Sequence, residues 1–269
     1  MSSSQETDVT AATTSIAFDR AASFYDRTRS LSPADAAALT TALIRETRAT
    51  AASRLLELGI GTGRIAAPLI EMGLHVTGID LARPMLDVLR QNHGRVPVAI
   101  GDVTHLPFPD RSFDVILAFH VLHLVPTWQT VLYEVARVVR PGGRFVHSTH
   151  WRDAGSANMR LRQHWRTMLL ARGVDVSRPG TRDEDQIGAV LRGLGAQGQR
   201  VEVAQGTETT TVREILARMA ARIWSDTWLV PDDLFPPALA ELTQWAATEF
   251  DLDAPQVEEY RLGFVVYGW

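Results

Sequence analysis

Cysteine and lysine are both absent from the 269-residue chain. Without cysteine, neither disulfide bonds nor thiolate metal sites can form. His147, His150 and His164 lack the spacing of a histidine metal site, so we expect no metal centre. Without lysine, the phosphate-binding loop that requires this residue is excluded. The net charge of −4 lacks the basic excess of most nucleic-acid-binding proteins, and we expect no nucleic-acid partner.

Long apolar runs are also missing. No stretch reaches the ~18–20 apolar residues that a membrane-spanning helix needs. Residues 1–9 are polar and rich in serine, which is unlike a signal peptide. We therefore expect a cytoplasmic protein with no membrane partner, either a monomer or a homodimer, in which residues 1–13 form a disordered lead.

Strand and helix signals alternate through much of the chain. After helical segments at residues 14–27 and 32–48, strands are expected at 54–58, 75–79, 96–100, 113–119 and 144–149, with helices at 64–72, 84–91 and 128–139. Repeated β–α units of this length predict an α/β fold, a doubly wound parallel sheet with helices on both faces.

The region after residue 150 is richer in helix signals. We expect helices near 158–171, 182–194, 212–223 and 236–250, and strands at 199–205 and 260–269. The two late strands would complete a seven-strand sheet. We expect a single domain over residues 14–269, with a helical cap formed by residues 14–48 and by insertions within 151–250.

A glycine-rich turn follows the first strand, with Gly59, Gly61 and Gly63 in G-x-G-x-G spacing. A dinucleotide fingerprint would require glycine where the chain has Arg64. Glu57 precedes the turn; its carboxylate would repel a pyrophosphate but would attract a sulfonium ligand that carries an ammonium group. Alternatively, these glycines could serve only to form a tight connection between the strand and the helix, without any ligand.

Two further carboxylates follow the next two strands. Asp80 could accept hydrogen bonds from both hydroxyls of a ribose, or it could cap the following helix. Asp102 could accept from an adenine amine, or it could be a turn residue. Because open α/β sheets bind ligands at the carboxyl ends of their strands, we expect these side chains to surround one ligand.

Several motifs together resemble the class I S-adenosylmethionine-dependent methyltransferases. They lie at residues 57–64, 76–86, 101–102, 113–117 and 137–143. The sequence FDRAASFYD at residues 18–26 is similar to the small-molecule branch that contains the ubiquinone and menaquinone biosynthesis methyltransferases. The resemblance covers about residues 16–150. It implies a Rossmann-like sheet with an antiparallel last strand and a helical cap, S-adenosylmethionine as cofactor, and S-adenosylhomocysteine as its product.

The resemblance also assigns cofactor contacts. It places Glu57 and the glycine turn at the methionine end, Asp80 on the ribose, and Asp102 on the adenine amine. The complete set of expected cofactor-binding residues is Tyr25, Glu57, Gly59, Ile60, Gly61, Thr62, Gly63, Asp80, Leu81, Met85, Asp102, Val103 and Phe119.

Catalytic residues are harder to predict, because methyl transfer depends on alignment and needs a base only when the acceptor must lose a proton. His120 and His123, just after the fourth strand, are the candidate bases, and each could instead be structural. Phe119 occupies the position of the asparagine in N-P-P-Y-type enzymes, which disfavours DNA adenine or protein glutamine as acceptor.

The expected substrate contacts are Tyr25, His120, His150, Trp151, Trp224 and Trp228. The resemblance implies a small-molecule acceptor, and we favour an oxygen, then a nitrogen or carbon, of an aromatic or hydroxylated metabolite. Two alternatives remain: an enzyme of another reaction type, such as a cyclase or decarboxylase, that uses the same cofactor, and a non-catalytic module that binds it.

Overall fold

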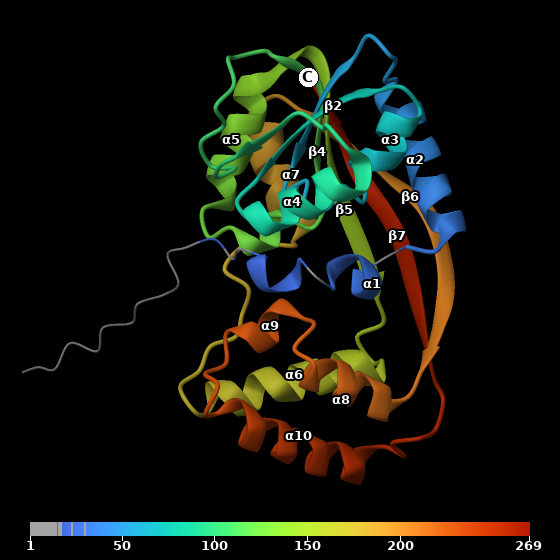
Figure 1. Ribbon diagram of the computed structural model, residues 1–269, viewed down its shortest axis with the longest axis vertical. Coiled ribbons are helices and arrows are strands. Elements are labelled where there is room, and N and C mark those ends of the chain that lie inside the picture. The colour runs from blue at the N-terminus through green and yellow to red at the C-terminus, as the bar shows by residue number, and fades with distance from the viewer. Residues whose placement is uncertain (1–14, 16–17, 23, 30) are drawn as a thin grey trace, which may run out of the picture.

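A mixed seven-stranded sheet organises the computed structural model, which describes residues 15, 18–22, 24–29 and 31–269 (Figure 1). The strand order is β3-β2-β1-β4-β5-β7-β6. In chain order the strands are β1 (Arg54–Leu58), β2 (His75–Asp80), β3 (Val98–Ile100), β4 (Phe113–Ala118), β5 (Val139–Arg152), β6 (Gln197–Thr210) and β7 (Gln256–Gly268). The first five strands pair in parallel, whereas β7 runs antiparallel to both β5 and β6. The predicted α/β fold and the antiparallel last strand are confirmed.

The helices lie close to the segments that the sequence predicts. They are α1 (Tyr25–Arg29), α2 (Pro33–Thr47), α3 (Ala66–Glu71), α4 (Arg83–His93), α5 (Trp128–Val138), α6 (Ala157–Leu170), α7 (Glu184–Gly193), α8 (Val212–Ala220), α9 (Ser225–Trp228) and α10 (Phe235–Glu249), with short 3₁₀ turns η1 (Asp19–Ala21) and η2 (Leu122–Leu124). The helix expected at residues 14–27 is instead η1 followed by α1, and its first residues lie outside the described part, as does the lead predicted at 1–13.

Helices cover both faces of the sheet. On one face, α5 and α7 pack against alternate strand residues such as Ile116 and Phe145. On the other face, α2, α3 and α4 pack against Leu117 and Val146. Successive strand residues point to opposite faces, so a strand covered on both sides is apolar on both, which explains the apolar run at residues 115–118 of β4.

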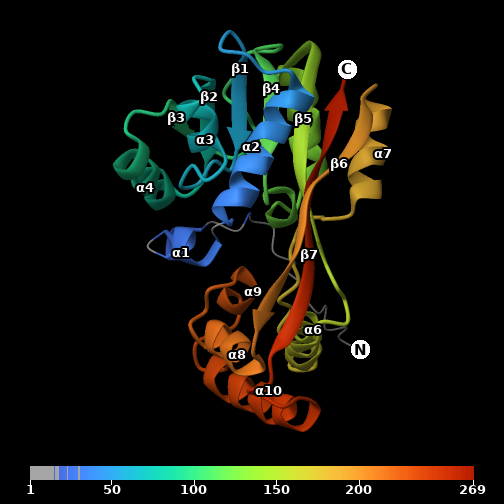
Figure 2. The same cartoon turned by 90° about the vertical axis from the view of Figure 1, so that its right-hand side faces the viewer.

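Helices α6, α8 and α10 form a cap with its own hydrophobic core. Leu161 and Trp165 of α6 pack there with Ile215 of α8 and Leu242 of α10. Strands β6 and β7 run past the rest of the sheet and reach this cap (Figure 2). Helices α2 and α7 lie within the ranges predicted for the cap, but the structure packs both against the sheet, because their apolar faces complete its two cores.

The cap is tied to the end of the sheet by a buried carboxylate. Glu258 of β7 is only 3% exposed, and its Oε1 accepts a hydrogen bond of 2.9 Å from the backbone N–H of Asn158, in the first turn of α6. This bond satisfies one of the donors that a helix N-terminus leaves unpaired. Among the described residues, no helix combines the length and apolar character needed to cross a membrane.

Candidate functional site

The glycine turn after β1 requires glycine both for its backbone and for its packing. Gly59, Gly61 and Gly63 have φ angles of +64°, +56° and +88°, in the left-handed region that other residues rarely adopt. A Cβ atom on Gly59 would lie 2.4 Å from Cγ2 of Val121, and one on Gly63 would lie 2.3 Å from Cδ1 of Leu89. The backbone of the turn therefore lies directly against its neighbours at the carboxyl end of β1.

Glu57 is a carboxylate buried beneath this turn. The residue is 2% exposed, and its Oε2 has no hydrogen-bond partner among the described residues. Burial raises the pKa of Glu57 to about 8, although the guanidinium of Arg64 acts in the opposite direction. A buried carboxylate that lacks a partner is costly, so a cationic or hydrogen-bond-donating ligand next to it would stabilise the ionised form.

Asp80 joins the end of β2 to the glycine turn. Its Oδ2 accepts a 2.8 Å hydrogen bond from the backbone N–H of Gly61, and its Oδ1 accepts one of 2.8 Å from Ala82. Burial raises the pKa of Asp80, while these two backbone donors lower it. Ala82, not Asp80, is the N-cap residue of α4, so the helix-cap alternative does not describe this aspartate.

A cavity opens beside the turn and encloses about 650 Å³, its opening to solvent included. It lies at the carboxyl ends of β1, β2, β3 and β4, and the N-terminal segment contributes Phe18 and Tyr25 to its wall. Nine of the expected cofactor residues line it: Tyr25, Gly59, Gly61, Asp80, Leu81, Met85, Asp102, Val103 and Phe119. Two of the three carboxylates predicted from strand ends, Asp80 and Asp102, thus line one cavity at the carboxyl edge of the sheet.

Four expected cofactor residues do not line this cavity and instead support it. Glu57 lies beneath the turn, and Ile60 packs against the backbone of Gly78. Thr62 donates its hydroxyl to Asp26 of α1, and Gly63 contacts α4. Tyr25 of α1 also lies 6.0 Å from the guanidinium of Arg64. These contacts hold α1 over the glycine turn.

Sequence reasoning missed some of the lining residues. Phe18 was noted only as part of the family-like segment, whereas Val121, Leu124 and Val125 come from the η2 turn after β4. The apolar pattern of residues 121–125 is the signal that could have indicated a buried turn beside the candidate histidines.

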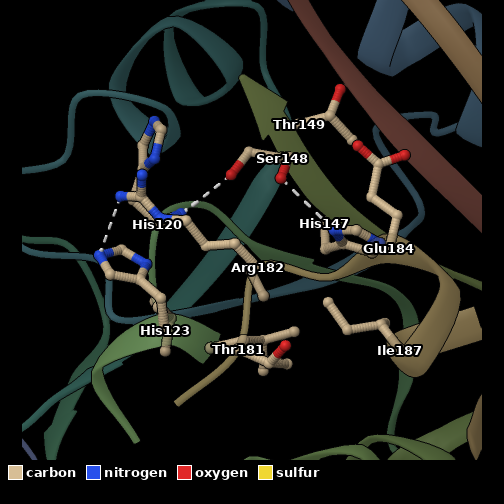
Figure 3. Close-up of a pocket in the computed structure, with 12 residues that line it drawn as sticks. His120, His123, His147, Ser148, Thr149, Thr181, Arg182, Glu184 and Ile187 are labelled. Atoms are coloured by element: carbon tan, nitrogen blue, oxygen red, sulfur yellow. Dashed lines mark hydrogen bonds between the residues drawn. The ribbon is translucent and has the colours of Figure 1, made fainter. Parts of the chain in front are cut away.

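His120 lies where this cavity meets a second one (Figure 3). Its φ of +59° is unusual for a residue other than glycine. Its backbone N–H donates a 3.0 Å hydrogen bond to Oγ of Ser148 on β5, which fixes this conformation. His123 is buried, and its Nε2 lies 3.2 Å from Nη2 of Arg182. Of the two candidate bases, His120 is the one in contact with both cavities.

The expected substrate residues are more dispersed. Tyr25 and His120 line the cavity beside the glycine turn, whereas Trp151 is 39% exposed and packs against the guanidinium of Arg261. Trp224 and Trp228 belong to the cap, where Trp228 contacts Phe18 with ring centroids 4.9 Å apart. His150 lies opposite Leu262 in the sheet, and its side chain is outside the described part. No three possible metal ligands converge among the described residues.

Comparison with known proteins finds methyltransferases. Residues 56–147 match the family described as Methyltransferase domain. An uncharacterized methyltransferase of Mycobacterium bovis is 37% identical over 139 residues, which cover 52% of this chain and 54% of that protein. A demethylmenaquinone methyltransferase of Tropheryma whipplei is 39% identical over 132 residues, covering 48% of this chain and 55% of that protein. The chain thus spans about half the length of these curated relatives.

A solved structure extends the likeness in fold over more of the chain. YcgJ from Bacillus subtilis has a TM-score of 0.57 at 19% identity and covers 85% of this chain and 97% of its own. The resemblance stated from the sequence agrees with these findings: residues 56–147 match a methyltransferase domain, and about half of the chain is similar to curated methyltransferases.

Proposed function

We propose that the protein transfers a methyl group from S-adenosylmethionine to a small-molecule acceptor. The observation that carries this proposal is the buried Oε2 of Glu57, which no described residue hydrogen-bonds, beside a cavity lined by two more carboxylates. An ammonium group of the ligand would meet Glu57, a ribose would meet Asp80, and an adenine amine would meet Asp102. Bound there, S-adenosylmethionine supplies an electrophilic methyl group and leaves as S-adenosylhomocysteine.

The side chains of the cavity favour this ligand over a dinucleotide. Leu81, Met85 and Phe119 form apolar walls suited to an adenine ring. Phe18 and Tyr25 add aromatic rings to the wall and would help to exclude water from the reacting groups. A pyrophosphate would place its negative charge near Asp80 and could not pair with Glu57 as a cation could, which opposes its binding.

His120 is the proposed base for an acceptor hydroxyl. Its backbone is fixed through Ser148, and its position between the two cavities would let it contact an acceptor placed next to the cofactor. An oxygen of an aromatic or hydroxylated metabolite remains our preferred acceptor, since a hydroxyl is the group that gains most from a base. The relative named demethylmenaquinone methyltransferase supports a small-molecule acceptor.

Binding of S-adenosylhomocysteine is the first test. At a hundredfold excess over its dissociation constant, the ligand should raise the unfolding free energy by about 2.7 kcal/mol, visible as a higher melting temperature. Calorimetry at millimolar ligand that gives no heat, together with an unchanged melting temperature, would refute the proposal.

Methyl transfer is tested separately with a radiolabelled methyl donor and a metabolite library. Label in a small-molecule product supports the proposal. Conversion of a metabolite without transfer of label would instead favour the cyclase or decarboxylase alternative, and cofactor binding without any product would favour the binding module.

A further inference from the structure

A second cavity adjoins the cofactor cavity and encloses about 490 Å³, its opening included. The two share His120 and Val121 in their walls. The second cavity lies at the carboxyl end of β4 and beside residues 147–149 of β5, next to the start of α7, and is bounded by the segment that carries Thr181 and Arg182 (Figure 3). A molecule in this second cavity would therefore be next to the proposed methyl donor, with His120 between them.

His147 is the most informative residue in the second cavity. It is 3% exposed, and its ring is stacked on Tyr267 with centroids 5.7 Å apart and planes 20° apart. Its Nε2 has no hydrogen-bond partner among the described residues. Burial lowers the pKa of His147 to about 4, so the ring is neutral near pH 7. An orphaned nitrogen in a fixed, neutral ring indicates a ligand that can pair with it.

The protonation state of Nδ1 of His147 decides which kind of group can form a hydrogen bond with Nε2. Nδ1 of His147 lies 3.4 Å from the backbone carbonyl oxygen of Ser148. A carbonyl only accepts hydrogen bonds, so this contact places the single ring proton on Nδ1. Nε2 then presents a lone pair and requires a donor. A hydroxyl group of a ligand meets that requirement.

The charged groups of the second cavity offset each other. Its wall contains one arginine, Arg182, and one glutamate, Glu184. Arg182 lies beside His123, and the carboxylate of Glu184 pairs with Arg200 at 2.6 Å. A ligand with a net charge of either sign would therefore meet one repulsive group, whereas a neutral ligand would not. The hydroxyls of Ser148, Thr149 and Thr181 add further hydrogen-bonding capacity.

We propose that the second cavity is the acceptor subsite and that it selects a neutral, hydroxylated molecule whose O–H donates to Nε2 of His147. This inference rests on the proposed methyl transfer and deepens it, since it names the class of acceptor and the residue that selects it. Ala118, Val121, Leu122 and Ile187 give the same cavity an apolar side, which suits an aromatic or aliphatic body.

The test uses four small probes of similar size: phenol, its methyl ether anisole, benzoate and benzylamine. Each is titrated into the full-length protein, with and without S-adenosylhomocysteine, and the imidazole resonances of isotope-labelled histidines are followed by NMR. Phenol should bind most tightly of the four and should shift the ring signals of His147. Anisole, which has no donor, should bind about three- to tenfold more weakly, the range expected for one lost neutral hydrogen bond.

Two variants make the test specific. His147→Phe keeps a flat ring against Tyr267 but removes Nε2, and it should weaken phenol binding by about three- to tenfold while leaving anisole binding unchanged. His164→Phe is the matched control, because His164 also stacks on an aromatic ring, that of Trp245 at 3.9 Å, but lies in the cap. It should bind all four probes as the parent does.

The inference is overturned if benzoate or benzylamine binds as tightly as phenol, or if phenol and anisole bind the parent equally. If His147→Phe fails to fold, the parent protein still tests whether a ligand hydroxyl donates to Nε2 of His147, through the phenol–anisole comparison and the NMR signals of His147. The titrations without S-adenosylhomocysteine test the second cavity even if that ligand fails to bind, a result that would refute only the proposed function.

Discussion

Substitution of Asp80 by asparagine separates a ribose contact from a purely structural role. Both carboxylate oxygens of Asp80 already accept backbone hydrogen bonds, from Gly61 and from Ala82. An asparagine has one acceptor oxygen, so its NH₂ group must face one of these two N–H donors. We therefore expect Asp80→Asn to lower the unfolding free energy by about 1–3 kcal/mol, the usual cost of an unsatisfied buried donor.

The effect on ligand binding has a second source. If the ionised carboxylate also accepts from a ribose hydroxyl, its replacement removes a charge-assisted hydrogen bond of about 1.5–3 kcal/mol. The affinity for S-adenosylhomocysteine should then fall by about 10- to 150-fold. A loosened glycine turn alone would also weaken binding, so the loss of affinity does not by itself identify the ribose contact.

A pair of truncated ligands distinguishes the two causes. The parent protein should prefer adenosine over 2′,3′-dideoxyadenosine, measured by calorimetry, because only adenosine carries the ribose hydroxyls. In Asp80→Asn this preference should shrink, whereas a loosened turn would weaken both ligands by the same factor. An unchanged preference in the variant would refute the ribose assignment, whatever happens to the melting temperature.

Three further predictions concern burial and packing. Because the pKa of Glu57 is raised, the folded protein holds a proton that the unfolded chain releases. The unfolding free energy should therefore fall as pH rises from about 4.5 to about 8. Urea titrations of Glu57→Gln should show that this pH dependence is lost. Gly59→Ala should lower the unfolding free energy by about 1–3 kcal/mol more than Gly73→Ala does. Both glycines have positive φ, but a Cβ on Gly73 would meet nothing within 4 Å, whereas one on Gly59 would meet Val121. Equal melting temperatures of the two variants would contradict this. Glu258→Ala should cost about 1–3 kcal/mol by leaving the N–H of Asn158 unpaired, and hydrogen exchange at that amide should accelerate.

The elements of the sheet and the lining of the cavity beside the glycine turn were largely predictable because their determinants are local. Apolar runs mark the strands, and Glu57, Asp80 and Asp102 each stand at or next to a strand end. Parallel pairing brings those ends to one edge, so positions far apart in sequence could be grouped before any coordinate was known. Ser32 illustrates the same locality, since its hydroxyl accepts from the N–H of Asp35 and begins α2 as predicted.

The second cavity was not predictable in the same way. The bond from His120 to Ser148 spans 28 residues and depends on the register between β4 and β5. From the sequence, His147 could be considered only as a possible metal ligand, because the residues next to it in the chain do not indicate that Tyr267 stacks on its ring. An amphipathic helix pattern also does not specify which apolar surface it covers, which is why α2 and α7 were expected in the cap.

The position of β7 has a consequence for how the chain folds. It is the last strand in sequence, yet it lies between β5 and β6, and residues 153–255, with the whole cap, separate it from β5. Until β7 has been synthesised, β6 has no strand to pair with, and β5 presents an unpaired edge. Because closing so long a loop must precede these contacts, completion of the sheet is a late and slow step of folding. During translation the open edge of β5 is therefore the region most exposed to mispairing and aggregation.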